Sequence, residues 1–85
     1  MRFDIQLFGA LREAEPGARL VIDAQADSIA ELRAAVAHAV APRWPANARA
    51  LLPHSAFASE RSVLRDADAV PVDGRLALLP PVSGG

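Results

Sequence analysis

Residues 28–41 most constrain the fold, because they predict one isolated amphipathic helix. Ser28 and Glu31 match the capping box S-x-x-E, in which two N–H groups at a helix start are satisfied reciprocally. Pro42 ends the helix, since it lacks an N–H and disfavours helical geometry in the residue before it. Apolar residues recur at spacings of three and four, at Ile29, Leu32, Val36 and Val40. A single helix with one apolar stripe has to bury that stripe against a sheet.

Short strand patterns on both sides of this helix supply the sheet. Residues 2–8 alternate apolar and polar side chains, and residues 19–24 form a second apolar run. The polar connection REAEPGA contains the turn pair Pro16-Gly17, which predicts an antiparallel hairpin. After the helix we expect a compact loop or one helical turn over 42–53, a short strand over 54–58, an irregular segment anchored by Val63 and Leu64, a tight turn at Asp73-Gly74, and a last strand RLALLP.

The order of these elements predicts an α+β fold. A hairpin followed by a helix and then by further strands requires a crossover, and a crossover makes a parallel strand pair. The apolar residues of RLALLP do not alternate cleanly, which predicts that both faces of that strand are covered. The expected architecture is a β-grasp, or ubiquitin-like, roll: a mixed sheet covered by one main helix. The domain is expected over residues 1–79, with an extended tail over 80–85.

The composition excludes several classes of function. The 85 residues carry a net charge of −1, and their nine Arg form no basic cluster, which argues against nucleic acid as a partner. No apolar stretch approaches the roughly 20 residues that span a bilayer, and the alternating N-terminus is unlike a signal peptide. We therefore expect a cytoplasmic protein with no membrane partner. The absence of Cys and Lys excludes disulfides, a cysteine nucleophile and Schiff-base chemistry.

Residues able to carry chemistry are present but not grouped. His38 lies off the apolar stripe and His54 lies near a strand start, so both are expected to be ordinary surface histidines and not metal ligands. Asp66, Asp68 and Asp73 lie in a turn-rich stretch, where aspartates usually cap loops. The sequence has no glycine-rich phosphate loop and no nucleophile elbow. We expect a chain that is not an enzyme alone and that holds no permanent cofactor or metal.

The end of the sequence is its most unusual part. Its proline pair stiffens the path that leaves the last strand. Its two glycines form a tip without Cβ atoms, which can enter a channel too narrow for side chains. Such a tip suits a terminal carboxylate that is delivered to the active site of another protein. The residues of this tail are Pro80, Pro81, Val82, Ser83, Gly84 and Gly85.

Three stretches resemble the small subunit of molybdopterin synthase, the MoaD family: LFGALREA, the pair RW at 43–44, and DGRLALLPPVSGG. The resemblance implies a β-grasp sulfur carrier. An E1-like enzyme would use ATP to adenylate the carboxylate of Gly85, and sulfur would replace AMP to give a thiocarboxylate. The tail would then enter the large synthase subunit, in a heterotetramer, to build molybdopterin from cyclic pyranopterin monophosphate. Arg75 and the stretch HSAFA depart from the family pattern, near surfaces that partners could touch.

Exposed apolar surface beside the tail is the expected partner contact. The candidates are Phe8, Phe57, Leu78, Pro80, Pro81 and Val82, with core packing as the alternative for Phe8 and Leu78. Arg12, from LREA, is expected either to pair with a partner carboxylate or to cap its own loop. Three other functions stay open: a sulfur carrier for thiazole synthesis, ubiquitin-like attachment to a target lysine, and a ubiquitin-like binding module with an inert tail.

Overall fold

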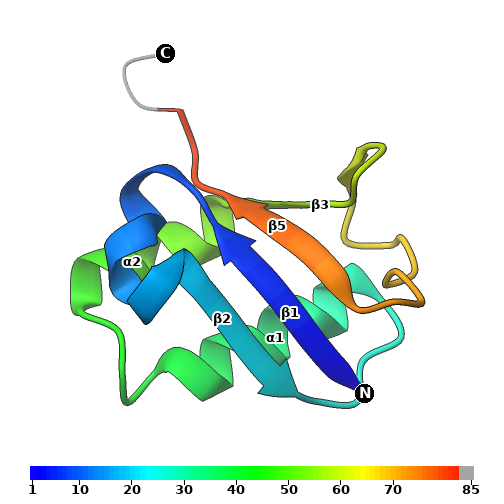
Figure 1. The fold of residues 1–85 in the computed structure, drawn as a ribbon, viewed down its shortest axis with the longest axis horizontal. Helices are drawn as coiled ribbons and strands as arrows, with labels where there is room; N and C mark the ends of the chain where they lie inside the picture. Colours follow the sequence, from blue (N-terminus) through cyan, green and yellow to red (C-terminus); the bar gives the residue numbers. More distant parts are fainter. Residues whose placement is uncertain (83–85) are drawn as a thin grey trace.

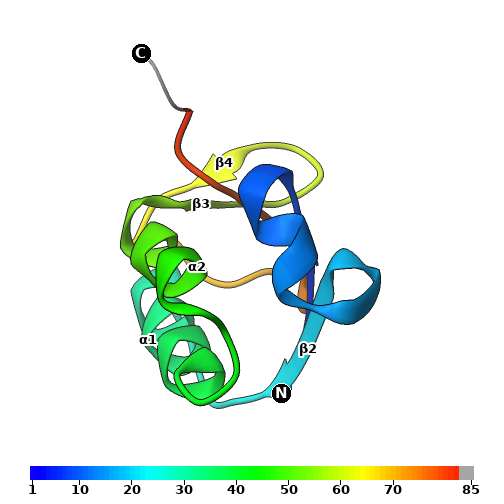
Figure 2. The ribbon, with the colours of Figure 1, turned by 90° about the vertical axis from the view of Figure 1, so that its left-hand side faces the viewer.

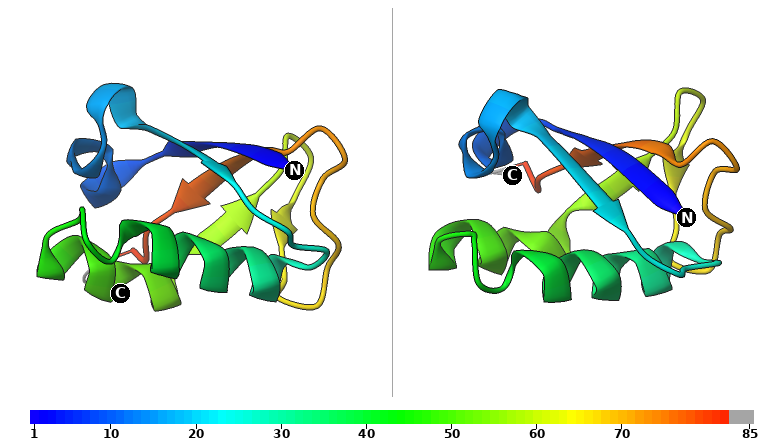
Figure 3. Two further views of the ribbon diagram at one scale, coloured as in Figure 1. Left: turned by 90° about the horizontal axis from the view of Figure 1, so that it is seen from below. Right: turned by 60° about the horizontal axis from the view of Figure 1, so that its bottom comes forward.

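The computed structural model describes residues 1–82 and contains a mixed five-stranded sheet with the helices α1 and α2 packed on one face (Figures 1 and 3). The strand order across the sheet is β2-β1-β5-β3-β4. This arrangement confirms the predicted β-grasp architecture. The elements in chain order are β1 (Arg2–Leu7), the 3₁₀ helices η1 (Gly9–Ala14) and η2 (Pro16–Ala18), β2 (Arg19–Asp23), α1 (Ile29–Val40), α2 (Ala46–Leu51), the 3₁₀ helix η3 (Leu52–His54), β3 (Ala56–Ala58), β4 (Val63–Leu64) and β5 (Arg75–Leu79).

The last strand, β5, lies in the middle of the sheet. It runs parallel to β1, with Ile5 opposite Leu76, and antiparallel to β3, with Phe57 opposite Leu78. β1 also pairs antiparallel with β2, and β3 with β4. The sequence predicts a parallel pair somewhere in the sheet, because a hairpin followed by a helix and further strands requires a crossover, and the structure identifies its members as β1 and β5.

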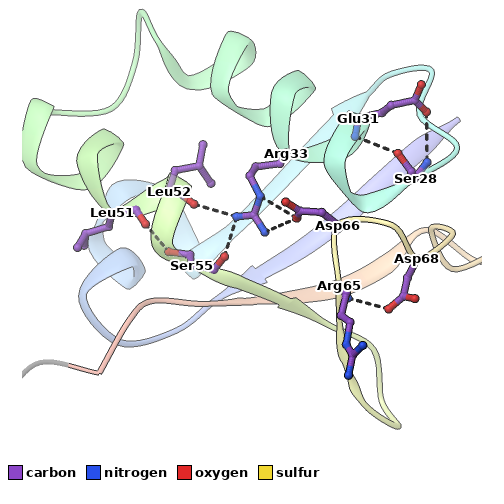
Figure 4. Close-up of polar contacts among 9 residues, drawn as sticks. All are labelled: Ser28, Glu31, Arg33, Leu51, Leu52, Ser55, Arg65, Asp66 and Asp68. Carbon is purple, nitrogen blue, oxygen red and sulfur yellow. Dashed lines mark hydrogen bonds and ion pairs between the residues drawn. The ribbon is translucent and has the colours of Figure 1, made fainter. Parts of the chain in front are cut away.

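α1 covers one face of the sheet and provides most of the helical side of the core (Figure 3). Its predicted capping box is present: the backbone N–H of Glu31 donates to Ser28 Oγ at 3.2 Å, and the N–H of Ser28 donates to Glu31 Oε1 at 3.2 Å (Figure 4). Burying each large apolar side chain stabilises the fold by about 1.5–3 kcal/mol. The largest fully buried side chains are Phe3, Phe57, Ile5, Leu7, Leu11, Leu20, Ile29, Leu32, Leu78, Val36 and Val40.

Three connections show how far local patterns predict structure. The stretch 42–53, expected to be a compact loop or one helical turn, contains the short helix α2. The connection REAEPGA is more than a polar turn, because it includes the end of η1 and all of η2, and its Glu15 is buried. Val63 is wrong as an anchor, since it is 61% exposed, whereas Leu64 and Val70 pack against the core. Among residues 1–82, no helix combines the length and the apolar composition that crossing a bilayer requires.

The expectation that both faces of the last strand are covered is also wrong. Leu76 and Leu78 are buried on the face that carries α1, while Ala77 and Leu79 are only half-buried. The strand therefore does alternate, and within residues 1–82 no second layer covers the apolar residues of its outer face. The clean pattern is hidden in the sequence because a small residue and a leucine occupy outward positions that polar residues usually take.

Candidate functional site

The tail leaves the fold from the end of β5, at the centre of the sheet. Leu79, the last residue of this strand, lies opposite Ala56 of β3. On the other side, the N–H of Phe8 donates to the carbonyl oxygen of Leu78 at 3.2 Å. The end of β5 is therefore held from both sides. We call Phe8, Gly9 and residues 79–82 the tail root.

Pro80 packs against Gly9, the first residue of η1. Gly9 has a φ of +56°, and a Cβ atom built on it would lie 2.8 Å from Cγ of Pro80. Pro80 is half-buried, whereas Pro81 is exposed and Val82 is 91% exposed. Figures 1 and 2 show residues 80–82 leaving the sheet and pointing away from the body of the fold. The tail therefore starts from a packed residue and becomes accessible at the next one.

The four body residues predicted to contact partners have different surroundings. Phe8 is 39% exposed, and Arg12 is exposed on η1, so both are available to a partner. Phe57 and Leu78 are fully buried, because they lie opposite each other in the β3–β5 pair and point into the core. Their assignment as partner contacts is wrong for the free protein. Core packing, the alternative for Leu78, is what the structure shows.

A buried carboxylate fastens the η1–η2 segment to the turn that follows α1. The side chain of Glu15 is 4% exposed, accepts a hydrogen bond from Nε1 of Trp44 at 2.7 Å, and also pairs with Arg43. A buried carboxylate requires such partners to offset its lost hydration. Leu11, in the same segment, is fully buried. Sequence reasoning noted the Arg43-Trp44 pair but not its contact with Glu15, because nothing in either stretch indicates that the two meet.

Arg33 of α1 fastens the start of β3 in a similar way (Figure 4). Its Nη1 donates to the carbonyl oxygens of Leu52 at 3.0 Å and of Ser55 at 2.6 Å, and its Nη2 donates to Asp66 Oδ1 at 3.0 Å. Its guanidinium carbon lies 5.2 Å from the centroid of the Phe57 ring, within the range of a cation–π contact. The strand that pairs with the end of β5 is therefore anchored to the main helix.

The remaining histidines and aspartates are separate surface residues. His38 and His54 are exposed on different elements, as predicted. Asp68 Oδ2 accepts from the backbone N–H of Arg65 at 2.7 Å, and Asp73 caps the residue two positions later at 3.0 Å, so both are the expected local caps. Within residues 1–82, no group of three or more histidines or acidic residues is arranged to hold a metal ion.

An open groove lies on the outer face of the sheet, toward the start of β5 and away from the tail root. Its lining includes Asp4, Arg19 and Arg75. Arg19 donates to both carboxylate oxygens of Asp4, and this contact lowers the pKa of Asp4 from its ordinary value of 3.8. The same hydrogen bond raises the pKa of Arg19. Both shifts move these groups further from neutral pH, so this ion pair is not a proton-transfer site.

The predicted carrier end falls beyond the part of the chain that the structure describes. Ser83, Gly84 and Gly85 lie outside residues 1–82. Their roles as the tip of the tail and as the site of the thiocarboxylate therefore stay predictions from the sequence.

Comparison with known proteins supports a carrier of the ubiquitin-like type. A model of the ThiS family matches residues 5–85, which includes the tail. The crystal structure of SAMP1 from Haloferax volcanii is similar in fold, with a TM-score of 0.65, 24% sequence identity and coverage of 100% of both chains. A comparison with curated proteins found no match. The sulfur-carrier type expected from the MoaD resemblance agrees with the family model, and the chain belongs to the ThiS family of ubiquitin-like sulfur carriers.

Proposed function

We propose that this protein carries sulfur as a thiocarboxylate on Gly85 and donates it in the active site of the large subunit of molybdopterin synthase. Family membership supports the carrier role. The observation that carries the proposal is the exit of the tail: a central strand, held from both sides, continues directly into Pro80, Pro81 and Val82, which point away from the body. A strand held in this way presents the tail in one direction.

The proposed chemistry uses the end of the backbone and needs no side chain of this protein. A carboxylate is a poor electrophile, so an E1-like enzyme first joins it to AMP and releases pyrophosphate from ATP. A sulfide equivalent then attacks the carbonyl carbon, and the new C–S bond forms as the C–O bond to AMP breaks. The thiocarboxylate is ionised at neutral pH and is a soft nucleophile. A sequence without Cys is compatible with this chemistry, because the carrier atom does not need a thiol side chain.

In this proposal the protein is the sulfur-donating subunit and not a catalyst by itself. The ATP belongs to the activating enzyme, and the chain holds no permanent cofactor. Two carriers and two large subunits would form the heterotetramer, and each pterin would receive two sulfurs. The proposal implies a cytoplasmic protein, because the activation step consumes ATP.

Exposed apolar surface at the tail root supports docking to these partners. Phe8 is 39% exposed beside the strand end, and Val82 is 91% exposed on the tail itself. Apolar side chains that gather at a functional end of a small protein mark a contact surface. Arg12, exposed on η1, adds a cation for a partner carboxylate. We propose Phe8, Arg12, Pro81 and Val82 as the contact residues.

The carrier step is tested by mass measurement. The protein is incubated with ATP, an E1-like activating enzyme and a sulfur source, and its intact mass is recorded. We expect the increase that accompanies replacement of one oxygen by sulfur, and no increase for a chain that lacks Gly85. Val72→Ala is the matched control, since Val72 is 98% exposed and lies outside the tail root. An unchanged mass for the intact protein would refute the carrier role.

The acceptor is tested with the thiocarboxylated protein in two reconstitutions. One contains the large synthase subunit with cyclic pyranopterin monophosphate, and the other contains a thiazole synthase with its substrates. Sulfur transfer only in the first supports the proposal. Transfer only in the second leaves the carrier step intact and assigns a thiazole acceptor. Binding is also compared between the full-length protein and a chain that lacks Gly84 and Gly85, both without the thiocarboxylate. Equal binding of the two to the partner would instead indicate a binding module with an inert tail.

A further inference from the structure

We propose that Gly9 is a positioning residue for the tail: its missing side chain lets the ring of Pro80 sit against η1, and this contact sets the direction in which the tail leaves β5. The inference rests on the proposed carrier function, because the direction of the tail matters only if the tail is delivered to a partner. Gly9 itself touches no reacting atom in this proposal.

The contact between Gly9 and Pro80 has no room for a side chain. A Cβ atom on Gly9 would lie 2.8 Å from Cγ and 3.4 Å from Cδ of Pro80. Non-bonded carbon atoms prefer separations of about 3.5–4.0 Å, so the ring would have to move. The ring of a proline can change its pucker, but it cannot swing away as a flexible side chain does, because its Cδ is bonded to the backbone nitrogen. We therefore expect a methyl group at position 9 to push on the ring and on the backbone of Pro80 to which the ring is bonded.

A displacement at Pro80 changes the course of the tail because the chain before it is fixed. Leu78 accepts a hydrogen bond from the N–H of Phe8, and Leu79 lies in the sheet opposite Ala56. Pro80 is thus the first residue at which the direction can change. Its own ring and that of Pro81 restrict the backbone, so a change made there is passed on along the chain.

Gly17 is a matched control within the same connection. Its φ of +68° is close to the +56° of Gly9, so alanine meets a similar backbone strain at both positions. A Cβ atom on Gly17 would have no heavy atom within 4 Å. Gly9→Ala and Gly17→Ala therefore share the conformational cost and differ in the contact with the tail.

The experiment compares four variants: Gly9→Ala, Gly17→Ala, Pro80→Ala, and the double variant with alanine at 9 and 80. The kcat and KM of the activating enzyme for each carrier are measured by ATP-dependent pyrophosphate release, and thermal denaturation reports the fold. We expect Gly9→Ala to lower kcat about tenfold relative to Gly17→Ala, since small misplacements of a reacting group cost up to about 10²-fold. KM should change by less than kcat does, because Phe8 and Arg12, the contact residues on the body of the fold, stay in place. In the Pro80→Ala background, which lacks the ring, Gly9→Ala should cost no more than Gly17→Ala does alone.

Each outcome decides the question. Equal losses of kcat for Gly9→Ala and Gly17→Ala, or an undiminished effect of Gly9→Ala without the Pro80 ring, would overturn the inference. If Gly9→Ala does not fold, the double variant reports instead: recovery of folding supports the contact with Pro80, and failure alongside a folded Pro80→Ala refutes it. If the wild-type protein itself is not adenylated, the proposed function is wrong. This outcome is distinguishable from the others, because they are differences between variants of a carrier that is adenylated.

Discussion

Replacing Trp44 with Phe should destabilise the protein by removing a donor from a buried carboxylate. Glu15 accepts from Nε1 of Trp44 at 2.7 Å, and its side chain is only 4% exposed, so water cannot readily replace this donor. A hydrogen bond to a charged group contributes about 1.5–3 kcal/mol. Trp44 is itself 3% exposed, and the smaller ring would lose roughly a further 1 kcal/mol of packing. The free energy of unfolding should fall by about 2.5–4 kcal/mol in total.

The measurement is urea denaturation followed by far-ultraviolet circular dichroism, since the variant loses the protein's single tryptophan and with it the usual fluorescence signal. The control is the same substitution in a Glu15→Leu background, in which an apolar side chain of similar size replaces the carboxylate and offers no acceptor. There Trp44→Phe should cost only the packing contribution of roughly 1 kcal/mol. The coupling energy between the two positions should then be at least about 1.5 kcal/mol.

One result would refute this reasoning. If Trp44→Phe lowers the free energy of unfolding equally in both backgrounds, the indole N–H contributes nothing through Glu15. The η1–η2 segment would then be held by Leu11 with its apolar contacts and by the pair between Glu15 and Arg43.

Three further predictions test other parts of the structure. Gly74→Ala should lower the thermal midpoint of unfolding, because Gly74 has a φ of +69° and a Cβ atom there would lie 2.2 Å from the carbonyl oxygen of Arg2. The decrease should exceed 4–8 °C, which is what about 1 kcal/mol corresponds to in a domain of this size. A variant with the midpoint of the wild type would contradict the turn geometry. Arg19→Gln should make the protein less stable than wild type at pH values above 3.8, the ordinary pKa of Asp4. This difference should vanish as the pH falls through the lowered pKa of Asp4, because a carboxyl with a lowered pKa stabilises the fold only while it is ionised. A difference in stability between variant and wild type that is the same at all pH values would contradict this prediction. Phe57→Ala should lower the free energy of unfolding, measured by urea denaturation, by about 3–5 kcal/mol, and Phe57→Leu should lower it less, since the ring is fully buried. A variant of unchanged stability that no longer binds the partner would instead support the predicted role of Phe57 as a partner contact.

Much of the fold was predictable because its signals are local. The capping box of α1 joins residues three positions apart, and the buried apolar residues of this helix recur every three or four positions, about once in each turn. The turn at Asp73-Gly74 rests on one glycine with positive φ. The presence of a parallel pair in the sheet followed from the order of the elements, because the crossover through a helix requires one, whereas its members, β1 and β5, came from the structure.

The surroundings of the tail root were less predictable. Phe8 and Leu78 are both apolar and both next to the tail in sequence or in space, yet one is 39% exposed and the other fully buried. The periodicity of β5 did not identify Leu78 as a core residue, because the outward positions of this strand also carry apolar residues. The role of Gly9 was hidden for a related reason: a glycine in a loop has many uses, and only the position of Pro80 shows which one applies.

The sequence by itself determined the class of fold, the central helix and the exit of a proline-stiffened tail from the last strand, because capping, periodicity and proline geometry act over a few neighbouring residues. The tertiary structure alone decided which apolar side chains are core and which are surface, and which polar groups meet. Glu15 and Trp44 are 29 positions apart, and Arg33 and Asp66 are 33 apart. Contacts over such separations exist only after the sheet has formed, so no local pattern can encode them.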